Sequence, residues 1–88
     1  MKAPDLSLYH FESCPYCERV RSAVRRLGIE IEMRDIQTTP KWRQELVAAT
    51  GKQMVPCLRI EIPGGATRWL HESLDIISYL ETEIAPRP

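Results

Sequence analysis

The chemistry of this chain is concentrated in two cysteines that flank two other residues, in the stretch ESCPYCERV at 12–20. Such a Cys-x-x-Cys pair can exchange disulfides, form a structural bridge or supply half of a zinc site. Pro15 follows Cys14 directly, so we expect Cys14 to be the N-cap of a helix and Pro15 its first residue. Free N–H groups and the positive end of the helix dipole favour a thiolate at Cys14. A thiolate is the attacking species in disulfide exchange.

The second cysteine, Cys17, lies one turn further along the expected helix and continues its apolar stripe. The spacing therefore predicts an exposed nucleophile, Cys14, and a sheltered resolving partner, Cys17. A zinc site would need two more ligands, and the candidates Cys57, His10 and His71 form neither a second Cys-x-x-Cys nor a tight His pair. We expect no metal and interpret the pair as a redox centre.

Two further stretches could bind a substrate. Pro56, in MVPC, opens an expected strand although proline cannot donate to a ladder. If the Val55–Pro56 bond is cis, the Val55 backbone can pair with an extended peptide, and the neighbouring CPYC favours this over a simple strand-entry proline. Glu72 and Ser73 precede the last expected helix, whose first N–H groups could bind a carboxylate while Glu72 meets an ammonium. An ordinary serine cap is the alternative there.

The elements that would position these residues follow from hydrophobic periodicity. Strands are expected at 6–11, 29–36, 57–62 and 67–70, and helices after Cys14, after Thr39 and from Ser73. This β-α-β-α-β-β-α order predicts an α/β fold with one four-stranded mixed sheet flanked by three helices. The first two strands should be parallel, and the last two should form an antiparallel hairpin.

Bulk properties narrow the function classes. The 88 residues suit one small domain, 1–88, in which we expect 1–5 and 85–88 to be frayed. Twelve basic and twelve acidic residues give a net charge of zero, which argues against nucleic-acid and anionic-membrane partners. No signal peptide or long apolar run is visible, and three cysteines do not suit a secreted disulfide framework. We expect a cytoplasmic monomer.

With these motifs the chain resembles the glutaredoxins, small proteins of the thioredoxin-like fold, from Leu6 to about Leu80. The resemblance rests on CPYC at 14–17, VP at 55–56 and ES at 72–73. It implies a glutathione-dependent thiol–disulfide oxidoreductase that reduces glutathione-mixed and protein disulfides, with glutathione as co-substrate. The roles it implies are nucleophile and second cysteine for Cys14 and Cys17, and glutathione binding for Tyr16, Gln53, Val55, Pro56, Glu72 and Ser73.

The segment ESLDIISYL at 72–80 instead resembles the N-terminal domain of glutathione S-transferases. A complete transferase has a second, helical domain, for which 88 residues leave no room. Two alternatives without turnover stay open: a glutathione-binding module, and a [2Fe–2S] module that Pro15 and Tyr16 disfavour. For the third cysteine, Cys57, we favour a small residue packed under a helix over an extra reactive thiol.

Overall fold

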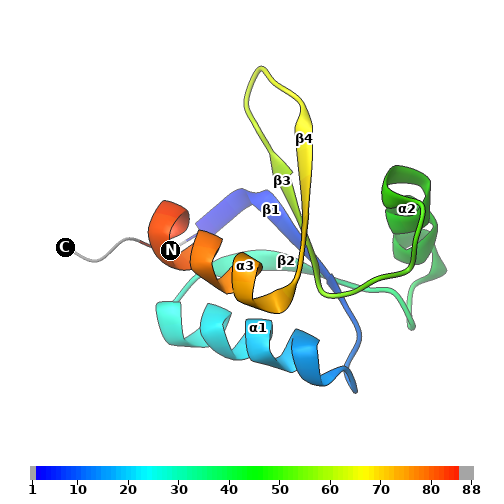
Figure 1. Ribbon diagram of the computed structural model, residues 1–88, viewed down its shortest axis with the longest axis horizontal. Coiled ribbons are helices and arrows are strands. Elements are labelled where there is room, and N and C mark those ends of the chain that lie inside the picture. Colours follow the sequence, from blue (N-terminus) through cyan, green and yellow to red (C-terminus); the bar gives the residue numbers. More distant parts are fainter. Residues whose placement is uncertain (1, 86–88) are drawn as a thin grey trace.

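The computed structural model describes residues 2–85, and their elements follow the expected order (Figure 1). The strands and helices are β1 (Lys2–His10), α1 (Pro15–Leu27), β2 (Glu30–Asp35), α2 (Pro40–Thr50), β3 (Cys57–Glu61), β4 (Thr67–His71) and α3 (Ser73–Tyr79). A one-turn π-helix, Leu80–Ile84, continues α3. No helix within residues 2–85 is long and apolar enough to span a membrane.

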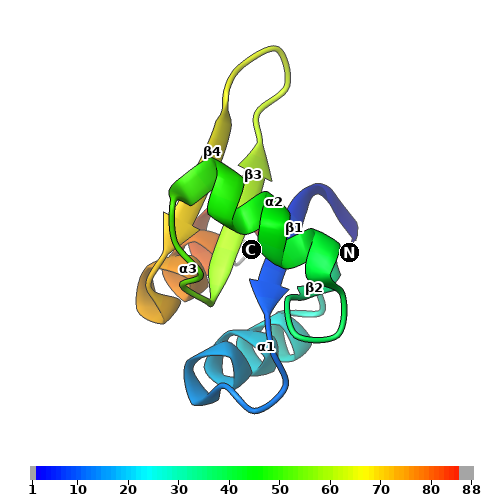
Figure 2. The same cartoon turned by 90° about the vertical axis from the view of Figure 1, so that its right-hand side faces the viewer.

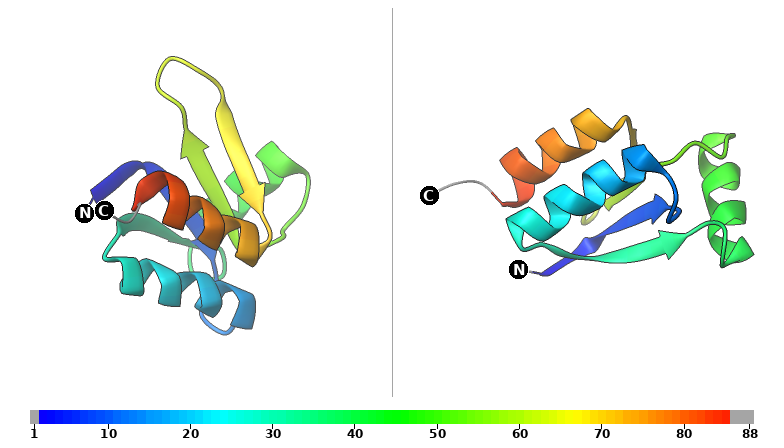
Figure 3. Two further views of the ribbon diagram at one scale, coloured as in Figure 1. Left: turned by 60° about the vertical axis from the view of Figure 1, so that its left-hand side comes forward. Right: turned by 90° about the horizontal axis from the view of Figure 1, so that it is seen from below.

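The four strands form one mixed sheet in the order β2-β1-β3-β4. β1 and β2 are parallel, whereas β3 is antiparallel to both β1 and β4. Helices α1 and α3 lie side by side along one face (Figure 3), and α2 runs across the other side of the strands (Figure 2). The predicted thioredoxin-like α/β fold with three helices is thereby confirmed.

Adjacent residues of a strand point to opposite faces, and this alternation divides the core in two. Leu8 and Leu58 face α1 and α3, where they pack with Val20 and Ile76. Their neighbours Tyr9 and Cys57 face α2, where they pack with Leu46. The central strand β1 is thus covered on both faces, as its apolar sequence predicted.

The α2 face also carries a buried polar cluster. The Tyr9 hydroxyl donates a short hydrogen bond to Glu45, and Arg34 Nη1 lies 2.8 Å from the same hydroxyl and 2.5 Å from Glu45 Oε1. The Arg34 guanidinium stacks over Trp42, 4.4 Å from the ring centre. Burial, and the hydrogen bond to Glu45, raise the pKa of Tyr9 to about 12.

Several local expectations were wrong. Residues 2–5, expected to fray, form the start of β1, while 86–88 lie outside the described residues. Alternation along 29–36 and 57–62 predicts that Met33 and Ile62 face inward. Met33 is instead 40% exposed because β2 is an edge strand. Ile62 is 44% exposed because it follows the end of β3 in the projecting hairpin (Figure 1). Ala49, expected on the apolar face of α2, is exposed, since α2 buries only Leu46 fully.

Candidate active site

The CPYC motif forms the start of α1. Cys14 is the N-cap with an extended backbone, φ −81° and ψ 117°, and Pro15 occupies the first helical position. The Cys14 Sγ accepts a hydrogen bond from the Cys17 backbone N–H at 3.3 Å. The predicted capping role of Cys14 is therefore confirmed, and its sulfur meets one of the unpaired N–H groups of the first turn.

The expected exposure of the nucleophile was wrong. Cys14 is only 6% exposed, and Cys17 is 0% exposed. The loop 11–13 connects β1 to α1, and the Cys14 N–H donates to the Phe11 carbonyl at 3.3 Å. Because so little of Cys14 is exposed, a substrate has restricted access to its sulfur.

The inner cysteine stays a thiol at neutral pH. Burial raises the pKa of Cys17 to about 12, and a hydrogen bond with Cys14 acts in the same direction. The Phe11 backbone and the positive charge of Arg21 lower this pKa only in part. A protonated Cys17 can donate its S–H to the Cys14 sulfur.

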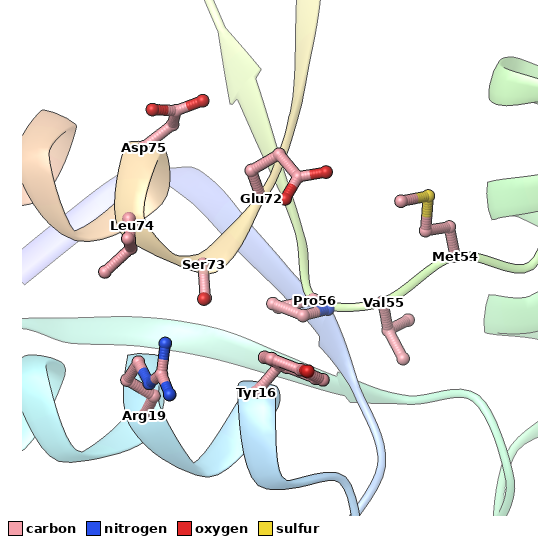
Figure 4. Close-up of a pocket in the computed structure, with 9 residues that line it drawn as sticks. All are labelled: Tyr16, Arg19, Met54, Val55, Pro56, Glu72, Ser73, Leu74 and Asp75. Atoms are coloured by element: carbon pink, nitrogen blue, oxygen red, sulfur yellow. The ribbon is translucent and has the colours of Figure 1, made fainter.

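A groove of about 580 Å³ opens beside the helix start (Figure 4). Three segments supply its walls: the first turns of α1, the loop before β3 and the junction of β4 with α3. The lining residues are Tyr16, Arg19, Met54, Val55, Pro56, Glu72, Ser73, Leu74 and Asp75. Figure 4 shows the Ser73 side chain pointing towards α1. The structure thus brings together five of the six residues predicted to bind glutathione.

Two backbone features shape this groove. The Val55–Pro56 peptide bond is cis, as predicted. Glu72 has a positive φ of 72°, which is rare outside glycine and is found most often at sites with a structural or ligand-binding purpose. Glu72, not Ser73, occupies the cap position of α3, so Ser73 is the first helical residue and is 7% exposed. The expectation of a serine cap was wrong.

The sixth predicted binding residue lies elsewhere. Gln53 lines a separate depression of about 420 Å³ together with Phe11, Gln37 and Arg43. Sequence reasoning also missed Arg19, which lies one turn beyond Tyr16 and faces the same groove. The i, i+3 spacing of these two residues was the signal that could have found it.

Part of the groove lining is apolar and exposed. Three of its residues are the large side chains Leu74, Tyr16 and Met54, which are 66%, 58% and 41% exposed. Exposed apolar side chains gathered around a cavity usually mark a binding surface. The remaining cysteine, Cys57, is fully buried in the core beneath α2, and its burial raises the pKa of the thiol to about 12. It is the packed residue that we favoured.

Residues 2–85 contain no group of three or more His, Cys, Asp or Glu side chains placed to hold a metal ion. Near the third cysteine, Cys57 Sγ lies 3.8 Å from His71 Nε2. Two side chains are too few for a structural zinc site, which needs four ligands.

Comparison with known proteins assigns a family to this fold and groove. The family model of the glutathione S-transferase N-terminal domain matches residues 8–88. The chain belongs to this family. Glutathione S-transferase N-terminal domains share the thioredoxin-like fold with glutaredoxins, which agrees with the mixture of motifs in the sequence.

Relatives of this N-terminal domain include both larger enzymes and small redox proteins. Prostaglandin E synthase 2 of Danio rerio is 34% identical over 84 residues, which cover 93% of the chain and 20% of that protein. Glutaredoxin 3 of Escherichia coli is 26% identical over 57 residues, 65% of the chain and 69% of that protein. The chain thus spans about a fifth of the first relative and about two thirds of the second.

The similar solved structures likewise include a larger enzyme and a small glutaredoxin. A maleylacetoacetate isomerase from Anaeromyxobacter dehalogenans, with bound GSH in its active site, matches with a TM-score of 0.69 and 29% identity, over 94% of this chain and 38% of that one. The glutaredoxin of Brucella melitensis matches with a TM-score of 0.56 and 28% identity, over 92% and 82%.

Proposed function

We propose that this domain is a glutathione-dependent thiol–disulfide oxidoreductase that uses Cys14 as its nucleophile. The observation that carries the proposal is the shared helix start: one turn of α1 holds the Cys14 sulfur against the Cys17 N–H and extends Tyr16 into the groove. A ligand bound in the groove would therefore contact the helix turn that carries the reactive sulfur, although Cys14 itself is not a lining residue. The glutaredoxin relatives and the GSH-bound isomerase support glutathione as that ligand.

The groove has groups suited to each part of glutathione, an extended tripeptide with an ammonium and two carboxylates. In our proposal the Val55 backbone pairs with the cysteine of glutathione as an added strand would. The Ser73 hydroxyl and the first N–H groups of α3 bind the γ-glutamyl carboxylate. Glu72 and Asp75, which line the same end of the groove, neutralise the ammonium. The Tyr16 ring covers the middle of the ligand.

The proposed reaction has two exchange steps. The Cys14 thiolate attacks the glutathionyl sulfur of a mixed disulfide, so the substrate thiolate leaves and takes up a proton while a Cys14–glutathione disulfide forms. A second glutathione thiolate then attacks the glutathionyl sulfur, releasing oxidised glutathione and restoring the Cys14 thiolate. Electrons balance, because two glutathione sulfurs end in one disulfide and the substrate sulfur is reduced.

The route through both cysteines should be slow. Burial raises the pKa of Cys17, and only its thiolate can attack the mixed disulfide, so little of the attacking form is present at pH 7. Glutathione in solution has a more readily ionised thiol and competes for the same sulfur. We therefore propose that the one-thiol route dominates for small glutathionylated substrates, in a cytoplasmic and monomeric protein.

The test is turnover of a small glutathionylated substrate, coupled to enzymatic recycling of oxidised glutathione. We expect Cys14→Ser to lose activity at least a hundredfold, because the nucleophile is gone. Cys17→Ser should keep a large part of the activity, and the control Cys57→Ala, in the core away from the groove, should match the parent protein. Full activity in Cys14→Ser would rule out the proposal.

One observation favours a second candidate, a glutathione-binding module without turnover. Cys14 is 6% exposed, which limits the approach of a bulky disulfide. Calorimetric binding of glutathione together with no exchange above the uncatalysed rate would establish this second function in place of the first.

A further inference from the structure

A buried arginine lies behind the reactive cysteine and is not used by the groove. Arg21 is on the inner side of α1, seven residues after Cys14, and is 8% exposed. Charged side chains are seldom so buried unless every polar atom finds a partner. The partners of Arg21 therefore indicate what its burial achieves.

Most of those partners lie before Cys14, at the end of β1 and in the loop that follows it. Nη1 donates to the Phe11 carbonyl at 3.1 Å, and Nη2 donates to the Glu12 carbonyl at 3.0 Å. Nη1 also lies 3.0 Å from His10 Nδ1, and Nε lies 3.2 Å from Glu18 Oε1. All three nitrogens of the guanidinium have partners. Three consecutive residues, His10, Phe11 and Glu12, contact this one side chain.

The Phe11 carbonyl connects this side chain to the nucleophile. It accepts from Arg21 Nη1 and also from the Cys14 backbone N–H, at 3.3 Å. We propose that Arg21 is a positioning residue for Cys14: it fixes the loop from His10 to Glu12, and the loop in turn fixes the Cys14 backbone so that its sulfur stays on the Cys17 N–H. The link to turnover depends on the proposed function, whereas the link to Cys14 reactivity does not.

The geometry requires an arginine. A planar fork can donate to two adjacent carbonyls and an imidazole at once, whereas the single ammonium of lysine cannot reach all three in one plane. The contact with His10 also requires a neutral imidazole whose Nδ1 accepts. Burial, and then the charge of Arg21, lower the pKa of His10, which keeps the ring in that neutral form.

The same helix provides a matched control. Arg25 pairs with Glu18 at 2.8 Å, as Arg21 does at 3.2 Å, but it is on the outer side of α1 with 63% of its side chain exposed. Arg25→Met removes one positive charge and the bond to Glu18, whereas Arg25→Lys keeps the charge, and neither variant touches the loop. Any effect of Arg21 beyond that of Arg25 therefore comes from the loop contacts.

The experiment measures the rate at which iodoacetamide alkylates Cys14, by peptide mass spectrometry, from pH 5 to pH 10. We expect Arg21→Lys to lower the rate at pH 7 by roughly threefold to tenfold and to move the half-maximal pH upward, and Arg21→Met to do so more strongly. Arg25→Lys and Arg25→Met should stay within about twofold of the parent protein. In the turnover assay, Arg21→Lys should lower kcat with little change in the KM for glutathione, because Arg21 does not line the groove.

Circular dichroism and thermal melting establish that each variant is folded, and if Arg21→Met does not fold, Arg21→Lys decides alone. A folded Arg21→Lys protein with the parent alkylation rate and pH profile would overturn the assignment. A parent protein that is alkylated at Cys14 but does not turn over the glutathionylated substrate would refute the proposed function only. The alkylation comparison would still test Arg21.

Discussion

The two buried thiols should be protected from alkylation by a factor that can be calculated from the structure. Burial raises the pKa values of both Cys17 and Cys57 from about 9 to about 12. A difference of three pKa units lowers the thiolate fraction about a thousandfold at any pH below 9, relative to an ordinary cysteine. Because only thiolates react with iodoacetamide at a useful rate, each buried cysteine should react about a thousand times more slowly in the folded protein than in the unfolded chain.

Transient unfolding does not mask this protection. A stability of about 5 kcal/mol, at the low end for small domains, leaves roughly 2 × 10⁻⁴ of the molecules unfolded. This unfolded fraction is several times smaller than 10⁻³, so global unfolding does not prevent a protection of about a thousandfold from being observed. The cleanest case is Cys57, because its pKa is raised by burial without a second thiol beside it.

The assay compares alkylation of Cys57 in buffer and in concentrated urea, with peptide mass spectrometry to resolve the three cysteines. In the folded protein the Cys57 rate should keep rising about tenfold per pH unit above pH 9, whereas in urea it should level off near pH 9. Circular dichroism at each pH confirms that the protein is folded. A folded-state rate within tenfold of the urea rate, or a plateau near pH 9, would refute the reasoning.

Three further predictions follow from the core and the groove. The pKa of Tyr9 is raised from 10.0 to about 12, so its contribution to stability is complete below pH 10 and is lost between pH 10 and 12, by at most about 3 kcal/mol. Tyr9→Phe should remove this part of the loss in urea titrations across that range. Leu46→Ala, at a fully buried position on α2, should lower the free energy of unfolding by about 2–5 kcal/mol, and the half-exposed Val47→Ala by less than about 1 kcal/mol. Ser73→Ala should raise the KM for glutathione roughly twofold to tenfold at nearly constant kcat, whereas Gln53→Ala, in a separate depression, should leave it unchanged.

Local signals in the sequence were sufficient to place the elements that carry the site. Cys14 and Pro15 mark the start of α1, and Gly28, with φ 68°, ends that helix in the left-handed conformation. Each of these signals depends on residues within a few positions of one another. The predicted parallel pairing of β1 and β2 follows for the same reason, because a short strand–helix–strand connection favours a parallel pair.

What the sequence did not reveal depends on contacts between distant residues. Arg21 contacts His10 and Phe11 across eleven and ten residues, and no local spacing indicates these hydrogen bonds. The separation of Gln53 from the groove depends on the direction that the chain takes between α2 and the cis Val55–Pro56 bond. Alternation along β2 predicts that Arg34 faces solvent. In the structure its guanidinium lies over the Trp42 ring of α2 and pairs with Glu45.

The helical periodicity of α1 places its residues in two groups, one facing the groove and one facing the core. Tyr16 and Arg19, one turn apart, face the groove, while Cys17 and Arg21 face inward and are buried. The cap residue Cys14 precedes both groups, and its sulfur accepts a hydrogen bond from the inner Cys17 N–H. A substitution on the outer side should therefore change ligand affinity, and one on the inner side should change the reactivity of Cys14. Measurement of both quantities for each variant of α1 would show whether these two functions separate along the helix as the structure predicts.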